Sequence, residues 1–162
     1  MKIAVLFCLF VLATLSTTPA TRAQLTNPFD NRPTGPTGSD GVLQSRIVEA
    51  ERLAGERGYG IRTGMADSKP LRQGARDTVT QLIGGSKPFI FVLTCDGSCG
   101  NLDVAAKIAE SGEPIKVTLT DDGHLAYLEV SKRELVRVEI STSIGNCSRA
   151  SCIYYIAAYE KF

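Results

Sequence analysis

The sequence predicts a mainly β protein: an antiparallel, jelly-roll-like β-sandwich of about seven or eight strands, preceded by one short amphipathic helix. Three observations carry this prediction. Residues 89–93 form an unbroken apolar run, apolar and polar residues alternate through much of residues 102–159, and turn-forming residues separate these segments at close intervals. Many short strands with turns between them are typical of two packed antiparallel sheets.

The N-terminal residues 1–23 have the parts of a secretory signal peptide. Lys2 supplies a positive charge, residues 3–15 are almost wholly apolar, and small residues follow as far as Ala23. Cleavage is expected after Ala23, with Ala20 as the alternative site. The apolar stretch is too short to span a bilayer comfortably, and no later segment reaches the roughly 20 apolar residues that a spanning helix needs. We therefore expect an exported protein, periplasmic or secreted, with no membrane span.

The chain that remains after cleavage has the length of one ordinary domain. Loss of Lys2 and Arg22 with the signal leaves one more acidic than basic residue, so the mature chain is almost neutral. A nucleic acid or an anionic membrane surface is therefore not expected as its main partner.

Residues 24–41 are rich in proline and glycine and predict a flexible tether. Apolar residues then recur at spacings of three and four, which predicts an amphipathic helix over residues 42–58. Ser39 or Asp40 is the expected cap of this helix, and Gly58 is its expected end.

Charged residues at neighbouring helical positions are expected to pair, Arg46 with Glu49 and Arg52 with Glu56. A helix this short is marginal alone and needs a packing partner. Its own domain is the favoured partner, and a second copy, in a weak dimer, is the alternative.

Residues 59–70 contain several glycines and are predicted to be a linker, which leaves residues 71–162 for the β-sandwich. These glycines do not form a dinucleotide-binding fingerprint, because that motif needs a strand before it and a helix after it. The apolar run is expected to be a core strand covered on both faces. The predicted strands, with this core strand as the second, are residues 77–83, 89–94, 102–108, 115–119, 126–130, 136–140 and 153–159.

Four cysteines remain after the signal peptide, and in an exported chain an even number indicates disulfides. The favoured pairing is local, Cys95 with Cys99 and Cys147 with Cys152, because each pair flanks a short loop of turn-forming residues. Pairing between the two loops is the first alternative. A four-cysteine zinc site is the second.

One stretch resembles a known family: LRQG at residues 71–74, DTVT at 77–80, Gly-Gly at 84–85, and FIFVLTCDGSCGNLD at 89–103. It is similar to the bacterial pre-peptidase C-terminal (PPC) domain, and more closely to small exported bacterial proteins that carry a CDxxCxxLD corner. The resemblance covers about residues 71–162. It implies a jelly-roll-like β-sandwich that accompanies secreted enzymes and has no catalytic residues of its own. The chain differs in having no peptidase domain, and in VAAK at residues 104–107, where the family has a more aliphatic or aromatic strand.

His124 is the only histidine, so a Ser-His-Asp or Cys-His mechanism would have to use it. A single histidine beside a hairpin turn is more typical of solvated surface, and paired cysteines are not nucleophiles. We therefore predict no catalytic residues, and a small hydrolase is the least favoured function.

Two further groups are candidates for binding. Asp96 and Asp103 flank the first cysteine loop and are candidate calcium ligands, but the favoured explanation is that Asp96 makes a side-chain turn and Asp103 binds backbone amides at the strand start. Tyr154, Tyr155 and Tyr159 are candidates for a ligand-contacting stripe, but core packing is the favoured explanation for them. No cofactor is expected.

These observations favour a non-enzymatic exported module that binds a protein, a glycan or an envelope component. The first alternative is a periplasmic inhibitor or immunity-type protein that blocks a secreted enzyme with a disulfide-pinned loop, and the second is a calcium-stabilised structural module. A protruding cysteine loop favours inhibition, whereas a flat aromatic face favours surface binding.

Overall fold

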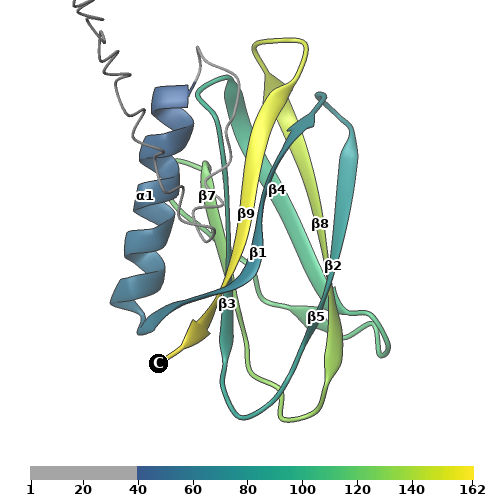
Figure 1. Ribbon diagram of the computed structural model, residues 1–162. Coiled ribbons are helices and arrows are strands. Elements are labelled where there is room, and N and C mark those ends of the chain that lie inside the picture. Colours follow the sequence, from purple (N-terminus) through teal and green to yellow (C-terminus); the bar gives the residue numbers. More distant parts are fainter. Residues whose placement is uncertain (1–39) are drawn as a thin grey trace, which may run out of the picture. The chain divides into compact units, whose positions relative to one another are not determined.

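The computed structural model describes residues 40–162 (Figure 1). The predicted signal peptide 1–23 lies outside these residues, and so does the predicted tether 24–41 except for its last two residues, which begin the helix. Within the described residues, no helix is long and apolar enough to cross a membrane.

The described chain forms a helix followed by nine strands in two sheets. One sheet has five strands in the order β1-β9-β3-β7-β6, and the other has four in the order β2-β8-β4-β5. All pairings in both sheets are antiparallel, which confirms the predicted β-sandwich. The elements are α1 (Asp40–Glu56), β1 (Tyr59–Leu71), β2 (Arg76–Ile83), β3 (Phe89–Cys95), β4 (Cys99–Ile108), β5 (Pro114–Ile115), β6 (Thr118–Leu119), β7 (Leu125–Val130), β8 (Val136–Cys147) and β9 (Cys152–Lys161).

Strand β3 lies in the middle of the five-stranded sheet and is buried on both faces, as its apolar run predicts. Phe91, Leu93 and Cys95 belong to the core between the two sheets. Ile90 and Val92 belong to a second core under helix α1. The domain is therefore layered as helix, five-stranded sheet and four-stranded sheet.

Helix α1 covers the outer face of the five-stranded sheet (Figure 1). It begins at Asp40 and ends at Glu56, two residues earlier at each end than predicted, and Gly58 follows with a φ of 81°. Its buried residues include Ala50 and Ala54, whose small side chains allow the helix to approach the strands closely. The helix thus packs on its own domain, as the favoured prediction states.

The prediction of a linker at residues 59–70 is wrong, because these residues are strand β1 and pair with β9 along its length. The pairing contains two register shifts, between Tyr59 and Ile61 and between Arg62 and Ala66. These irregularities interrupt the alternation by which a strand is recognised in sequence. Pro70 is compatible with the strand because β1 is at the edge of the sheet.

The predicted strand at residues 115–119 is also corrected. It is divided into β5, which joins the four-stranded sheet, and β6, which joins the five-stranded sheet. This division and the added β1 raise the strand number in the described chain from the predicted seven or eight to nine.

Two polar contacts join the two sheets at Asp77 in β2: the hydroxyl of Tyr154 in β9 donates to its carboxylate, and Lys69 in β1 pairs with the same carboxylate at 3.5 Å. The bond from Tyr154 is the main cause of the lowered pKa of Asp77. Burial, followed by the same bond, raises the pKa of Tyr154. The folded state thus favours the charged carboxylate and the neutral phenol.

The pH dependence of stability follows from these two shifts. The stabilisation of the folded state by ionised Asp77 is present above the ordinary pKa of this carboxyl, 3.8, and is lost as the pH falls below that value. The contribution of Tyr154 is present below its ordinary pKa of 10.0 and is lost as the pH rises above it. In urea unfolding at pH 7, we expect Tyr154→Phe to lower the free energy of unfolding by about 1–2 kcal/mol. We also expect the stability of this variant to fall less steeply than that of the wild type at both low and high pH. An alkaline loss as steep as in the wild type would contradict this assignment.

Candidate functional site

Both disulfides lie at one end of the sandwich. Cys95 is bonded to Cys99 and Cys147 to Cys152, which confirms the local pairing and excludes the two alternatives, a cross-pairing of the loops and a four-cysteine zinc site. The two loops also touch, because the Ser148 N–H donates to the Ser98 carbonyl at 2.9 Å. We call residues 95–99 and 147–152 together the cystine end.

The carboxylate of Asp96 holds the first loop together from inside. It is 2 % exposed, and its Oδ1 accepts from the N–H and the hydroxyl of Ser98 at 3.0 and 2.5 Å. Its Oδ2 accepts from the N–H of Ile153 at 3.1 Å. Both oxygens are therefore used by the protein, as the turn interpretation predicts.

The second calcium candidate, Asp103, is exposed on strand β4. Within residues 40–162, neither Asp96 nor Asp103 belongs to a group of three or more side chains placed to hold a metal ion. The geometry therefore gives the calcium hypothesis no support.

Helix α1 is fastened to the cystine end by Arg46. Its Nη1 donates to the carbonyl oxygens of Cys95 and Asp96 at 2.6 and 2.7 Å. The predicted pairing of Arg46 with Glu49 is wrong, because Glu49 binds Arg52 instead. An arginine on a helix predicts a local ion pair, and only the tertiary fold brings these carbonyl groups within its reach.

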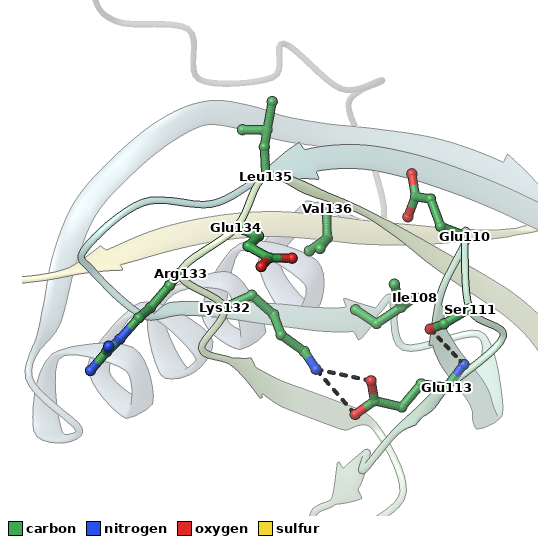
Figure 2. A pocket seen from close by; sticks show the side chains of 9 residues that line it. All are labelled: Ile108, Glu110, Ser111, Glu113, Lys132, Arg133, Glu134, Leu135 and Val136. Carbon is green, nitrogen blue, oxygen red and sulfur yellow. Dashed lines mark hydrogen bonds and ion pairs between the residues drawn. The ribbon is translucent and has the colours of Figure 1, made fainter.

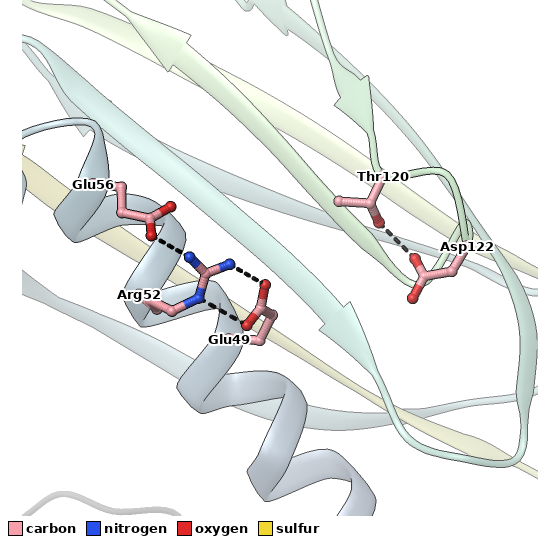
Figure 3. A network of polar contacts seen from close by, with 5 residues as sticks. All are labelled: Glu49, Arg52, Glu56, Thr120 and Asp122. Carbon is pink, nitrogen blue, oxygen red and sulfur yellow. Dashed lines mark hydrogen bonds and ion pairs between the residues drawn. The ribbon is translucent and has the colours of Figure 1, made fainter.

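The polar network on and near the helix is shown in Figure 3, with Arg52 held between Glu49 and Glu56. The hydrogen bond from Arg52 lowers the pKa of Glu49. Separately, Asp122 accepts from the Thr120 hydroxyl at 2.6 Å and from the His124 backbone N–H at 3.1 Å. The Thr120 bond is the main cause of the lowered pKa of Asp122.

The second cysteine loop projects from the sandwich. Figure 1 shows the connection between β8 and β9 extending beyond the neighbouring strand ends, at the top of the view. Ser148, Arg149 and Ala150 are all exposed, although the loop is closed by a disulfide and bonded to the first loop. This is the protruding, pinned loop that the sequence associates with inhibition.

The tyrosine stripe is not a surface. Tyr154 and Tyr155 are fully buried and Tyr159 is 5 % exposed, so none of them forms an exposed aromatic face. Tyr154 lies in the core between the sheets, and the other two lie under helix α1. Core packing, the favoured explanation, is therefore confirmed, and the three tyrosines offer no exposed stripe to a ligand because helix α1 covers the second face of their strand.

His124 is half-buried and does not lie on a solvated surface. Its carbonyl accepts from the Thr94 hydroxyl at 2.8 Å, and its Nδ1 is buried with no hydrogen-bond partner within the described chain. In a catalytic triad this nitrogen donates to a carboxylate, a bond that His124 does not make within residues 40–162.

A hollow of about 510 Å³ lies at the opposite end of the sandwich (Figure 2). Ile108 and Val136 provide apolar lining, and Lys132 is paired with Glu113 at 2.9 Å. Its residues come from the turns after β4 and β7, so the sequence shows two ordinary turns and no site. The lining is mostly charged, and one of its ion pairs, between Lys132 and Glu113, is formed within the protein.

No protein-family model matches this chain, and no curated protein matches it.

Proposed function

We propose that this chain is a non-enzymatic, exported binding module that recognises a protein partner through the cystine end. The observation that carries the proposal is the exposed Ser148–Arg149–Ala150 segment on a loop closed by a disulfide. A loop that is ordered before binding loses little conformational freedom when the partner arrives. Tyr154, Tyr155 and Tyr159, by contrast, are buried and do not offer an aromatic surface to a partner.

The chemistry of the loop indicates the kind of partner. Arg149 is exposed and forms no ion pair with any other described residue. A guanidinium presents a planar set of donors that matches a carboxylate. The expected partner is therefore a protein with an acidic pocket or patch wide enough to admit this loop.

The same feature supports a second candidate, an inhibitor of a secreted enzyme. A rigid loop with an arginine near its tip has the charge and form to enter an acidic specificity pocket, such as the aspartate-containing pocket of a trypsin-like protease. An inhibitor gains affinity when its loop is held in the bound form before contact. Export is supported by the two disulfides, which persist in oxidising compartments. Membership of the PPC family remains a prediction.

Replacing Arg149 tests the binding proposal. Wild-type protein, Arg149→Ala and Arg133→Ala are immobilised in parallel and exposed to the same envelope extract, and captured proteins are quantified by mass spectrometry. Arg133 is an exposed arginine at the opposite end of the sandwich and is the matched control. We expect a protein whose capture falls at least tenfold with Arg149→Ala and is unchanged with Arg133→Ala. Equal capture by all three proteins would contradict the proposal.

Enzyme assays separate the two candidates. The wild-type protein is titrated against trypsin-like proteases and against any captured enzyme, with Arg149→Ala as the comparison. Inhibition that disappears in the variant supports the inhibitor function. Binding to the captured partner without any loss of its activity supports a binding module alone.

A further inference from the structure

The ladder between β3 and β7 aligns a histidine with a cysteine. Thr94 pairs with Leu125, so continuing the register by one residue places Cys95 opposite His124. Directly opposed residues lie on the same face of a sheet. Cys95 faces the core between the sheets, as does Ala126 two residues after His124. His124 therefore points toward the interior, beside the first disulfide.

The side-chain ligand atoms of Cys95, Cys99 and His124 all lie within 4.8 Å of one another. The imidazole Nδ1 is buried without a hydrogen-bond partner in residues 40–162. A buried polar atom without a partner is uncommon in native structures and calls for a specific explanation. A role as a metal ligand, taken up once the bond between the two sulfurs is broken, is such an explanation.

We propose that the reduced form of the Cys95–Cys99 pair binds one thiophilic metal ion, Cu(I) or Zn(II), through the two cysteine sulfurs and the imidazole of His124. A dithiol reductant supplies two electrons and two protons to the disulfide. The S–S bond breaks, Cys95 and Cys99 become thiols, and the reductant becomes a disulfide. Binding of the ion then displaces the two thiol protons to solvent, because the thiolate is the metal ligand.

The distances fit such an ion after a small movement. With metal–sulfur bonds of about 2.3 Å and a metal–nitrogen bond of about 2.0 Å, ligand atoms around one ion lie roughly 3.5–3.8 Å apart. The largest separation now is no more than 4.8 Å, so the imidazole needs to approach by about 1 Å, while the sulfurs separate when their bond breaks. Two soft sulfurs and one imidazole suit Cu(I), and Zn(II) would take a fourth ligand.

The test measures metal binding in both redox states. Purified protein is reduced with a phosphine under anaerobic conditions, freed of reductant, and titrated with Zn(II) and separately with Cu(I), each against a chromophoric chelator. We expect one ion per reduced chain for at least one of the two metals and none for the oxidised chain. Tight binding of Cu(I) alone identifies a three-coordinate site, and binding of both ions identifies a site that also accepts a fourth ligand.

Two variants locate the ion. His124→Ala should weaken binding at least tenfold, and its oxidised form should keep the wild-type circular dichroism spectrum. A Cys147→Ser, Cys152→Ser double variant should still bind one ion when it is reduced. The proposal would be overturned by no stoichiometric binding to the reduced wild type, by unchanged affinity in His124→Ala, or by loss of binding in the double variant. Unfolding of the reduced wild type at 25 °C would also overturn it, because the site requires the folded register of β3 and β7.

Discussion

Replacing Phe91 with alanine should lower the free energy of unfolding by about 3–5 kcal/mol. The ring is fully buried in the core between the two sheets. Its strand pairs with β7 on one side and β9 on the other, so the backbone has little freedom to close the space that the ring leaves. The loss of buried apolar surface and the remaining cavity both destabilise the fold.

Chemical denaturation followed by circular dichroism measures this loss, and Phe162→Ala is the matched control. The same atoms are removed there from a side chain that is 76 % exposed, so a change of no more than about 0.5 kcal/mol is expected. Similar losses in the two variants would mean that Phe91 is not at the centre of the core.

Much of this architecture can be predicted from the sequence because its strongest signals are local. The apolar run of β3 predicts burial on both faces, and the structure confirms it with a sheet on one side and a helix on the other. Short loops of turn-forming residues between close cysteines predict both local disulfides. Strand β1 could not be predicted in this way, because its pairing with β9 depends on a partner about ninety residues away and contains two register shifts.

The candidate site was less accessible to sequence analysis, for two different reasons. Arg46 binds carbonyl groups about fifty residues away, and nothing in its local sequence indicates this contact. The inward orientation of His124, by contrast, could have been predicted from the residues that follow it. Ala126, Leu128 and Val130 all face the core between the sheets, and His124 continues their alternation by one further step.

The second large loss of stability is expected from a substitution in helix α1. Replacing Ala50 with glutamate should destabilise the docked helix by about 3 kcal/mol or more, because it introduces a charge at a fully buried position against the five-stranded sheet. The helix can avoid this penalty by leaving the sheet, so the free energy of docking sets an upper limit on the measured loss. Departure of the helix would expose apolar side chains of β3, among them Ile90 and Val92. We therefore expect Ala50→Glu to show both lower stability and self-association.

Limited proteolysis, hydrogen exchange of the helix amides and size-exclusion chromatography follow these changes. Val48→Glu is the matched control, since it adds the same charge to the same helix at a side chain that is 55 % exposed. We expect rapid hydrogen exchange and cleavage within residues 40–56 in Ala50→Glu, and wild-type behaviour in Val48→Glu. This result would show that helix α1 covers the sheet and is held there by its buried face, which contains Ala50 and Ala54. If instead the wild type is a dimer that Val48→Glu converts to a monomer, the exposed face of the helix is an interface between two copies, and the weak dimer is the correct assignment.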